Sequence, residues 1–195
     1  MYSRFAALGL MIFFFCSSIS CDHGEPNRGG GERKVIDIDK TVERLQKHVQ
    51  QLTVTIGERS VSLPENLEKT AAYIESFFKD IDLPVHRESY PYKDFTVSNI
   101  VANIDFSANP NKHYLLGAHY DSVWGTVGAD DNASAIAVQL ETARQLRAKL
   151  EEEKLDLRVK FVSFALEEPP VYGTNRMGSK VHAKNAKKEK EKIDG

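Results

Sequence analysis

Three short segments of this sequence carry the side chains best suited to catalysis. His119-Tyr-Asp121 places a carboxylate two positions after an imidazole, while Asp130-Asp131 and Glu167-Glu168 are pairs of adjacent carboxylates. One imidazole among several carboxylates suits a divalent metal ion, with zinc the first candidate. Each segment also has a plainer explanation, because polar residues end strands and Asp residues commonly cap helices. A metal site therefore requires a fold that brings all three segments together.

The elements around these segments are predicted to form a strand–helix–strand unit. An apolar strand over 113–118 precedes His119, a helix is expected over about 133–150, and a strand over 157–166 precedes Glu167. Two strands joined through a helix are normally parallel, with a right-handed crossover. Their carboxyl ends then share one edge of the sheet, where the helix begins and where ligand sites of open α/β sheets form. We therefore expect the three segments to converge on one rim.

Within each segment the two polar side chains can take different tasks. Asp121 is suited to orient His119, because a ligating histidine usually gives its other ring N–H to a carboxylate. One of Asp130 and Asp131 can cap the helix while the other bridges metal ions. Neighbouring side chains at a strand end point in different directions. One carboxylate of the Glu167-Glu168 pair can therefore bind metal while the other acts as a base.

The chain before this unit is predicted to contain two helices. Apolar residues at helical spacing favour a helix over 35–52, with Asp37 or Asp39 as its cap. A second helix is expected to begin at Pro64, because proline suits the first turn of a helix, with Ser62 as its candidate cap.

The remaining elements complete an α/β fold class. Alternating residues over 85–92 and 95–106 predict an antiparallel hairpin, which we expect beside the strand at 113–118. A loop and a helix are expected after Pro170. Together the elements predict a single domain over 35–195, three-layer α/β/α with a mixed, largely parallel central sheet.

The N-terminus has the pattern of a secretory signal over 1–21, in which a positively charged start precedes the apolar run 5–15. Ser18-Ile-Ser-Cys21 resembles a bacterial lipoprotein box, which would make Cys21 the lipidated residue and 22–34 a flexible tether. An ordinary secretory signal is the alternative. We expect an exported protein, periplasmic or at the cell surface, that meets a membrane only through Cys21.

Composition restricts the other partners and cofactors. The 195 residues are 41% hydrophobic and 28% charged, which indicates a globular chain with enough length for a core. The formal net charge of −2 does not predict a nucleic-acid partner. Beyond Cys21 the sequence has no cysteine, so we expect neither a disulfide nor a thiolate metal site in the mature domain. Oligomeric state is left open.

At its three polar segments the sequence resembles the co-catalytic zinc aminopeptidases, metallopeptidase family 28, the group of bacterial leucyl aminopeptidase and aminopeptidase Y. The resemblance covers about residues 68–195. It rests on three motifs in order, which are Gly117-Ala-His119-Tyr-Asp121-Ser, Gly128-Ala-Asp-Asp131-Asn-Ala-Ser134 and Phe164-Ala-Leu-Glu167-Glu168. It implies the phosphorylase/hydrolase-like zinc exopeptidase fold and a peptide substrate.

The resemblance also assigns a role to each polar residue. His119 and Glu168 would bind zinc, Asp131 would bridge two zinc ions, and Asp121 would orient His119. Glu167 would be the general base that takes a proton from water as it attacks the peptide bond. Asp130 would then cap the helix and shape its loop.

Two departures from the family pattern affect these expectations. Pro169-Pro170 follow Glu168 where a valine–glycine type of loop is more usual. The family takes its remaining zinc ligands, a carboxylate and a histidine, from further downstream, and neither His182 nor Asp194 matches them. We therefore expect a fold incomplete at its C-terminus, either a fragment or a short gene product, that holds at most one zinc well and has weak activity by itself.

Three functions are weighed on this basis. The first is an exported zinc-dependent aminopeptidase that removes N-terminal residues from peptides, with cobalt or manganese as alternative metals. The second is a glutaminyl cyclase-type acyltransferase, which resembles the first in fold and motif order but uses one zinc. The third is a lipid-anchored binding domain that has kept the fold and lost catalysis.

Overall fold

The structure is a computed structural model and describes residues 36–195. The predicted signal over 1–21, its lipidated Cys21 and the tether over 22–34 lie outside the described residues, as does the first residue of the predicted domain. None of the described helices is long and apolar enough to cross a membrane.

The described chain begins with helices, continues with three strands, and ends with a helix, a strand and a last helix. Its elements are α1 (Ile38–Gln50), the π-helical turn η1 (Gln51–Ile56), α2 (Pro64–Asp80), β1 (Val85–Tyr92), β2 (Phe95–Asp105), β3 (Lys112–His119), the irregular turn η2 (Ala129–Ala133), α3 (Ser134–Lys149), β4 (Leu157–Phe164) and α4 (Gly178–Glu189). Each predicted helix and strand is present, with bounds close to those expected. The main extension is η1, which continues the first predicted helix beyond residue 52 to Ile56.

The four strands form one mixed sheet in the order β1-β2-β4-β3. β3 and β4 are parallel and joined through α3, so the predicted crossover unit is confirmed. β1 and β2 form the predicted antiparallel hairpin. The hairpin lies beside β4 and not beside β3 as predicted, and the β2–β4 pair is antiparallel. Among the described residues only one of the three strand pairs is therefore parallel, fewer than predicted.

Burial explains why β4 and not β3 takes the inner position. Phe161 and Val162 of β4 point to opposite faces of the sheet and are both fully buried, as a strand covered on both sides requires. Tyr114 of β3 is 41% exposed. The start of β3 also meets the last two residues, because Asp194 donates its N–H to the His113 carbonyl and Gly195 accepts the Leu115 N–H.

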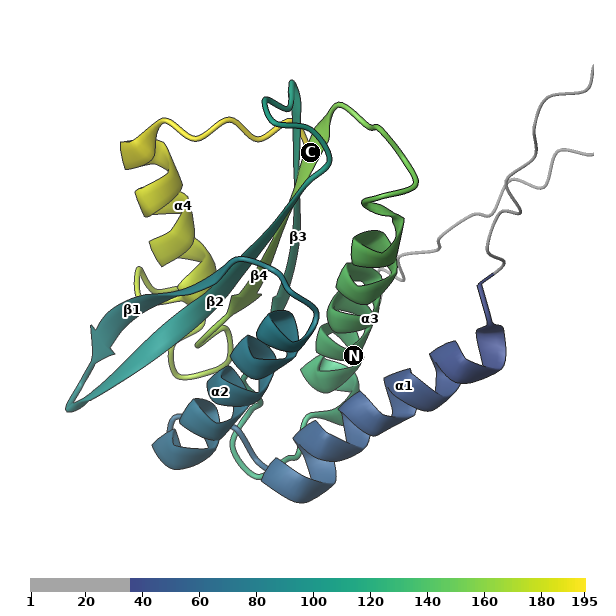
Figure 1. The fold of residues 1–195 in the computed structure, drawn as a ribbon. Helices are drawn as coiled ribbons and strands as arrows, with labels where there is room; N and C mark the ends of the chain where they lie inside the picture. The colour runs from purple at the N-terminus through teal and green to yellow at the C-terminus, as the bar shows by residue number, and fades with distance from the viewer. Residues whose placement is uncertain (1–35) are drawn as a thin grey trace, which may run out of the picture. The chain divides into compact units, whose positions relative to one another are not determined.

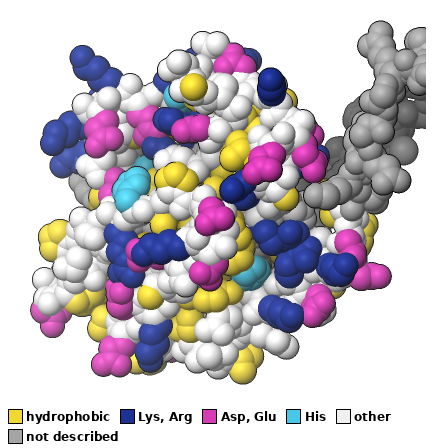
Figure 2. All heavy atoms as spheres, viewed as in Figure 1, with side chains coloured by type: hydrophobic (Ala, Val, Ile, Leu, Met, Phe, Trp, Pro, Cys, Tyr) yellow, Lys and Arg dark blue, Asp and Glu magenta, His cyan; other side chains and the backbone are white. Residues whose placement is uncertain are grey.

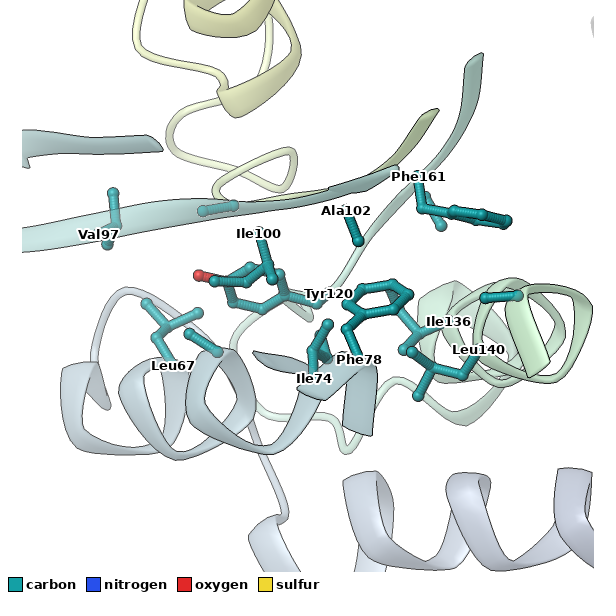
Figure 3. Packing of buried hydrophobic residues seen from close by; sticks show 14 of the residues in the cluster. Leu67, Ile74, Phe78, Val97, Ile100, Ala102, Tyr120, Ile136, Leu140 and Phe161 are labelled. Atoms are coloured by element: carbon teal, nitrogen blue, oxygen red, sulfur yellow. The ribbon is translucent and has the colours of Figure 1, made fainter. Parts of the chain in front are cut away.

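Helices cover both faces of the sheet, which confirms the three predicted layers (Figure 1). α2 and α3 lie on one face and α4 on the other, while α1 packs on the outside of α3. The main core lies between the sheet and α2 with α3 (Figure 3). Its buried members include Leu67, Ile74 and Phe78 of α2, Ile100 and Ala102 of β2, Ile136 and Leu140 of α3, and Phe161 of β4.

Two of the predicted helix caps can be checked. The side chain of Asp37 accepts the N–H of Lys40 at 3.1 Å, so it is the cap of α1. The prediction for Ser62 is wrong: Leu63 precedes α2, no side chain caps it, and the N–H of Asn66 donates to the Leu63 carbonyl at 2.9 Å. On the face shown in Figure 2, side chains of both charge signs are interspersed with hydrophobic ones.

Candidate metal centre

The three polar segments meet at one rim of the sheet, at the ends of β3 and β4 and at the start of α3. His119, Asp131 and Glu168 each offer a ligand atom there, and these atoms all lie within 4.8 Å of one another. The crossover unit accounts for the meeting, because parallel β3 and β4 end at the same edge and η2 begins there. The expected convergence is therefore present in the structure.

Tyr120 fixes the direction of the two side chains that flank it. Its ring is buried in the core, its hydroxyl donates to the Ser98 carbonyl at 2.9 Å, and its N–H donates to the Phe164 carbonyl at 2.9 Å. Successive side chains along an extended chain point in opposite directions. Anchoring Tyr120 in the core therefore turns His119 and Asp121 away from it, toward the rim.

The imidazole of His119 lies between two carboxylates. Its Nδ1 is 3.3 Å from Oδ1 of Asp121, and its Nε2 is 3.0 Å from Oδ1 of Asp131. Burial lowers the pKa of His119, but the hydrogen bond and charge of Asp121, with the charges of Glu167 and Asp131, raise it overall. If Nδ1–H donates to Asp121, the lone pair of Nε2 faces the Asp131 carboxylate. A cation or a proton must then lie between them.

Asp121 has a wider role than the sequence predicted. Its carboxylate is buried, with Oδ1 accepting the N–H of Glu167 at 3.0 Å and Oδ2 accepting the N–H of Glu168 at 2.9 Å. Because Oδ1 also faces His119 Nδ1, one side chain fixes both the histidine and the turn that carries the two glutamates.

Asp131 projects from the irregular turn η2. Its φ and ψ are −116° and 93°, outside the helical region, and its side chain is 73% exposed. The expectation that Asp130 caps the helix is wrong, because Oδ1 of Asn132 accepts the N–H of Ala135 at 3.3 Å. Asp130 contributes its carbonyl, which accepts the Ser134 hydroxyl at 2.8 Å. The cap moves to Asn132 because the turn is not helical before it.

The two glutamates occupy different environments. Oε2 of Glu167 lies 3.9 Å from Nε2 of His119, so this carboxylate is beside the candidate ligands. Burial raises the pKa of Glu168, and the neighbouring carboxylates, Asp131 first among them, raise it further against the opposing effect of His119. A groove of about 470 Å³ runs past Glu168 and Asp131, between Pro169 and the loop 123–131.

These observations fit a zinc ion held by His119, Asp131 and Glu168. Three protein ligands of nitrogen and oxygen type are the usual set of a catalytic zinc site. A cation also explains why several carboxylates gather around one imidazole, because it relieves their mutual repulsion. The predicted ligand roles of these three residues remain predictions, as do those of Asp121 and Glu167.

Comparisons with known proteins identify relatives of this chain. The protein named "Uncharacterized protein YfbL" from Escherichia coli (strain K12) is 37% identical over 149 residues, covering 72% of this chain and 44% of that protein. The chain therefore spans less than half the length of this relative.

Two solved structures share the fold. The LapA aminopeptidase of Legionella pneumophila gives a TM-score of 0.65 at 15% identity, over 85% of this chain and 46% of that one. The glutaminyl cyclase of Fimbriiglobus ruber gives a TM-score of 0.59 at 20% identity. The match covers 86% of this chain and 61% of that one. At such identities the likeness shows the fold alone. Residues 99–194, about half of the chain, match the family described as Peptidase family M28, and this segment belongs to that family.

Proposed function

We propose that this chain supplies the catalytic rim of an exported zinc aminopeptidase that removes N-terminal residues from peptides. The observation that supports it most directly is the position of Glu167, 3.9 Å from His119 Nε2 and beside three candidate ligand atoms within 4.8 Å of one another. A carboxylate so placed, but outside the ligand set, suits a general base. Export and a lipid anchor at Cys21 are part of this proposal.

The residues of the rim would divide the work of hydrolysis. When bound, zinc would acidify water and stabilise negative charge on the scissile carbonyl oxygen. Glu167 would accept the proton of the attacking water and return it to the leaving amine. Asp121 would keep His119 in one tautomer and hold the backbone of Glu167 in place. The groove beside Glu168 and Asp131 offers room for the peptide.

A glutaminyl cyclase activity is the second candidate. It is favoured by a relative named glutaminyl-peptide cyclotransferase from Dictyostelium discoideum, 27% identical over 149 residues, with 63% of this chain and 40% of that protein covered. An enzyme of either type could use a carboxylate as a proton carrier beside zinc. The acceptor of the acyl group would then differ, being water in hydrolysis and the substrate's own amine in cyclisation.

One experiment separates the candidates. The purified whole protein, loaded with zinc, would be incubated with a leucyl peptide and a glutaminyl peptide of equal length, and the products identified by mass. We expect free N-terminal amino acid from the leucyl peptide. Loss of ammonia from the glutaminyl peptide without hydrolysis would establish cyclisation. Turnover of neither peptide by a protein that binds zinc would favour the binding domain.

A further inference from the structure

Arg59 is a buried cation that the proposed chemistry does not use. Its relative exposure is 0%, and among residues 36–195 no carboxylate forms an ion pair with it. Burial lowers the pKa of Arg59, and the charge of Asp121 opposes that change only in part. A buried charge without a paired anion is costly unless its donors are satisfied. The hydrogen bonds of the guanidinium therefore decide how Arg59 is accommodated in the interior.

Two of these bonds reach the segments that carry candidate metal ligands. Nε of Arg59 donates to the carbonyl of Tyr120 at 2.7 Å, directly after His119 in the chain. Nη2 donates to the carbonyl of Gly128 at 3.0 Å, three residues before Asp131. One rigid, planar guanidinium thus joins the end of β3 to the loop that leads into η2.

The third nitrogen ties both segments to the helical layer. Nη1 of Arg59 faces the carbonyl of Val127 at 2.7 Å, that of Leu52 at 3.0 Å and that of Gly57 at 2.9 Å. Leu52 lies within η1, and Gly57 directly follows it. The loop before Asp131 is therefore held against a packed helical turn and not only against the neighbouring loop.

Ser122 adds a second connection to Arg59 through the main chain. The N–H of Arg59 donates to Ser122 Oγ at 3.0 Å, and the N–H of Ser122 donates back to the Arg59 carbonyl at 3.3 Å. Ser122 Oγ in turn donates to the Thr126 carbonyl at 3.0 Å. We call the guanidinium bonds and these Ser122 bonds together the Arg59 clasp.

The clasp leaves no free space at its centre. A Cβ placed on Gly128 would lie 3.1 Å from Arg59 Nη2, 2.6 Å from Ser122 Cβ and 2.4 Å from the Asp131 carbonyl oxygen. The contact with Asp131 shows that the clasp and the candidate ligand share one packed region. A shift of the guanidinium would therefore also change the position of the Asp131 main chain.

We infer that Arg59 is a positioning residue that sets the separation of His119 and Asp131 by bonding the backbone beside each of them. The inference rests on the proposed zinc centre. The guanidinium also supports the fold, because its loss would leave buried carbonyls without a donor, so the test must separate zinc affinity from stability. Groups that orient metal ligands typically change metal affinity 10–100-fold when mutated.

The test compares zinc affinity with stability in the whole protein. Zinc dissociation constants would be measured by competition with a chromogenic chelator, and melting temperatures without zinc, for the wild type, Arg59→Lys and Ile74→Ala. Lysine keeps the charge but cannot bond carbonyls arranged around a planar fork. Ile74 is buried in α2 and its apolar side chain makes none of the hydrogen bonds of the clasp, so its truncation controls for lost stability.

We expect Arg59→Lys to weaken zinc binding at least tenfold and Ile74→Ala to stay within threefold of the wild type at a similar fall in melting temperature. Wild-type affinity in Arg59→Lys, or equal weakening in Ile74→Ala, would overturn the inference while leaving the zinc proposal intact. A wild type that binds no zinc overturns both. If Arg59→Lys does not fold, Ser122→Ala replaces it, with at least threefold weakening expected and unchanged affinity counting against the clasp.

Discussion

The carboxylate of Asp121 accepts the backbone N–H of Glu168 through Oδ2 at 2.9 Å. Its other oxygen accepts the N–H of Glu167 at 3.0 Å and lies 3.3 Å from Nδ1 of His119. The ends of β3 and β4 are therefore joined by a buried side chain as well as by the sheet. Moving this one carboxylate would disturb a candidate ligand on each strand and the candidate base between them.

Replacing Asp121 with asparagine should weaken zinc binding 10–100-fold, because the group that orients His119 is lost. An amide has one acceptor oxygen, so its NH₂ would face a backbone N–H of the glutamate turn. Leaving that buried donor unsatisfied should lower the free energy of unfolding by about 1–3 kcal/mol. Chelator competition measures the first effect and urea denaturation without zinc measures the second.

Asp130→Asn is the matched control for that substitution. Asp130 is an exposed aspartate next to Asp131, and its contribution to the turn is made by its main-chain carbonyl. Zinc affinity should therefore remain within threefold of the wild type. Equal losses in the two variants would mean that negative charge near the rim matters and the geometry around Asp121 does not.

Glu167→Gln should separate catalysis from metal binding. Glutamine keeps the size of the side chain but cannot accept the proton, so kcat on the substrate that the wild type turns over should fall about 10²–10⁴-fold. Zinc affinity should hardly change, because Glu167 lies outside the candidate ligand set. Glu168→Gln should instead lose zinc. An unchanged kcat in Glu167→Gln, measured at saturating zinc, would rule out the proposed base.

Gly128→Ala should be among the most damaging small substitutions in the loop before α3. Gly128 has a φ of +50°, and an added Cβ would meet main-chain and side-chain atoms within 3.1 Å. Left-handed backbone alone costs roughly 1–2 kcal/mol for a residue with a Cβ. Gly125→Ala is the control, because its φ is +84° but nothing lies within 4 Å of the new atom.

Thermal denaturation of both glycine variants would measure the difference. In Gly125→Ala the free energy of unfolding should fall only by the cost of the left-handed backbone. In Gly128→Ala it should fall by at least about 2 kcal/mol more, since a packed region must shift. Equal losses of stability in the two variants would mean that the loop can rearrange around a side chain at residue 128. The clasp around Arg59 would then be less rigid than its contacts indicate.

The rim was predictable because local patterns determine it. Apolar runs set the bounds of β3 and β4, the helix between them required a parallel pair, and polar residues at the strand ends then had to meet. The neighbour of the hairpin was not predictable in the same way. Strand order depends on which surfaces pack across the whole sheet, and β4 competes for the inner place through its two buried faces.

Arg59 shows a different limit of the sequence. It sits in a stretch that reads as a loop, and its bonds to Tyr120 and Gly128 span 61 and 69 residues. All the acceptors of the guanidinium are main-chain carbonyls, so no type of partner side chain in the sequence indicates these contacts. Asp121 was predicted to orient His119, but its bonds to the glutamate turn depend on how closely β3 and β4 end together, which spacing does not reveal.

Glu88, on the face of the sheet that α4 covers, gives a prediction about the stability of the protein at low pH. Its carboxylate accepts hydrogen bonds from Asn99 at 2.7 Å and Asn185 at 2.5 Å, and lies 3.2 Å from Nδ1 of His182. Burial raises the pKa of Glu88, but the bonds from His182, Asn99 and Asn185 outweigh it and lower the pKa to about 2. The ionised form is therefore the one that the fold stabilises.

The sign of the pH effect follows from this lowered pKa. An unfolded glutamate titrates at 4.5, so the stabilisation by Glu88 is complete above that pH and is lost as the pH falls from 4.5 toward 2. Glu88→Gln should lower the free energy of unfolding at pH 7 by roughly 2–3 kcal/mol and flatten its decline between pH 4.5 and 2. Urea denaturation at a series of pH values measures both.

Two comparisons make the Glu88 result decisive. Glu141 also has a pKa lowered to about 2, so part of the acid dependence should survive in Glu88→Gln. Glu65→Gln, an exposed change in the first turn of α2, should keep the wild-type dependence. If Glu88→Gln loses stability but follows the wild-type curve between pH 4.5 and 2, the network around Glu88 contributes through packing and not through the charge of its carboxylate.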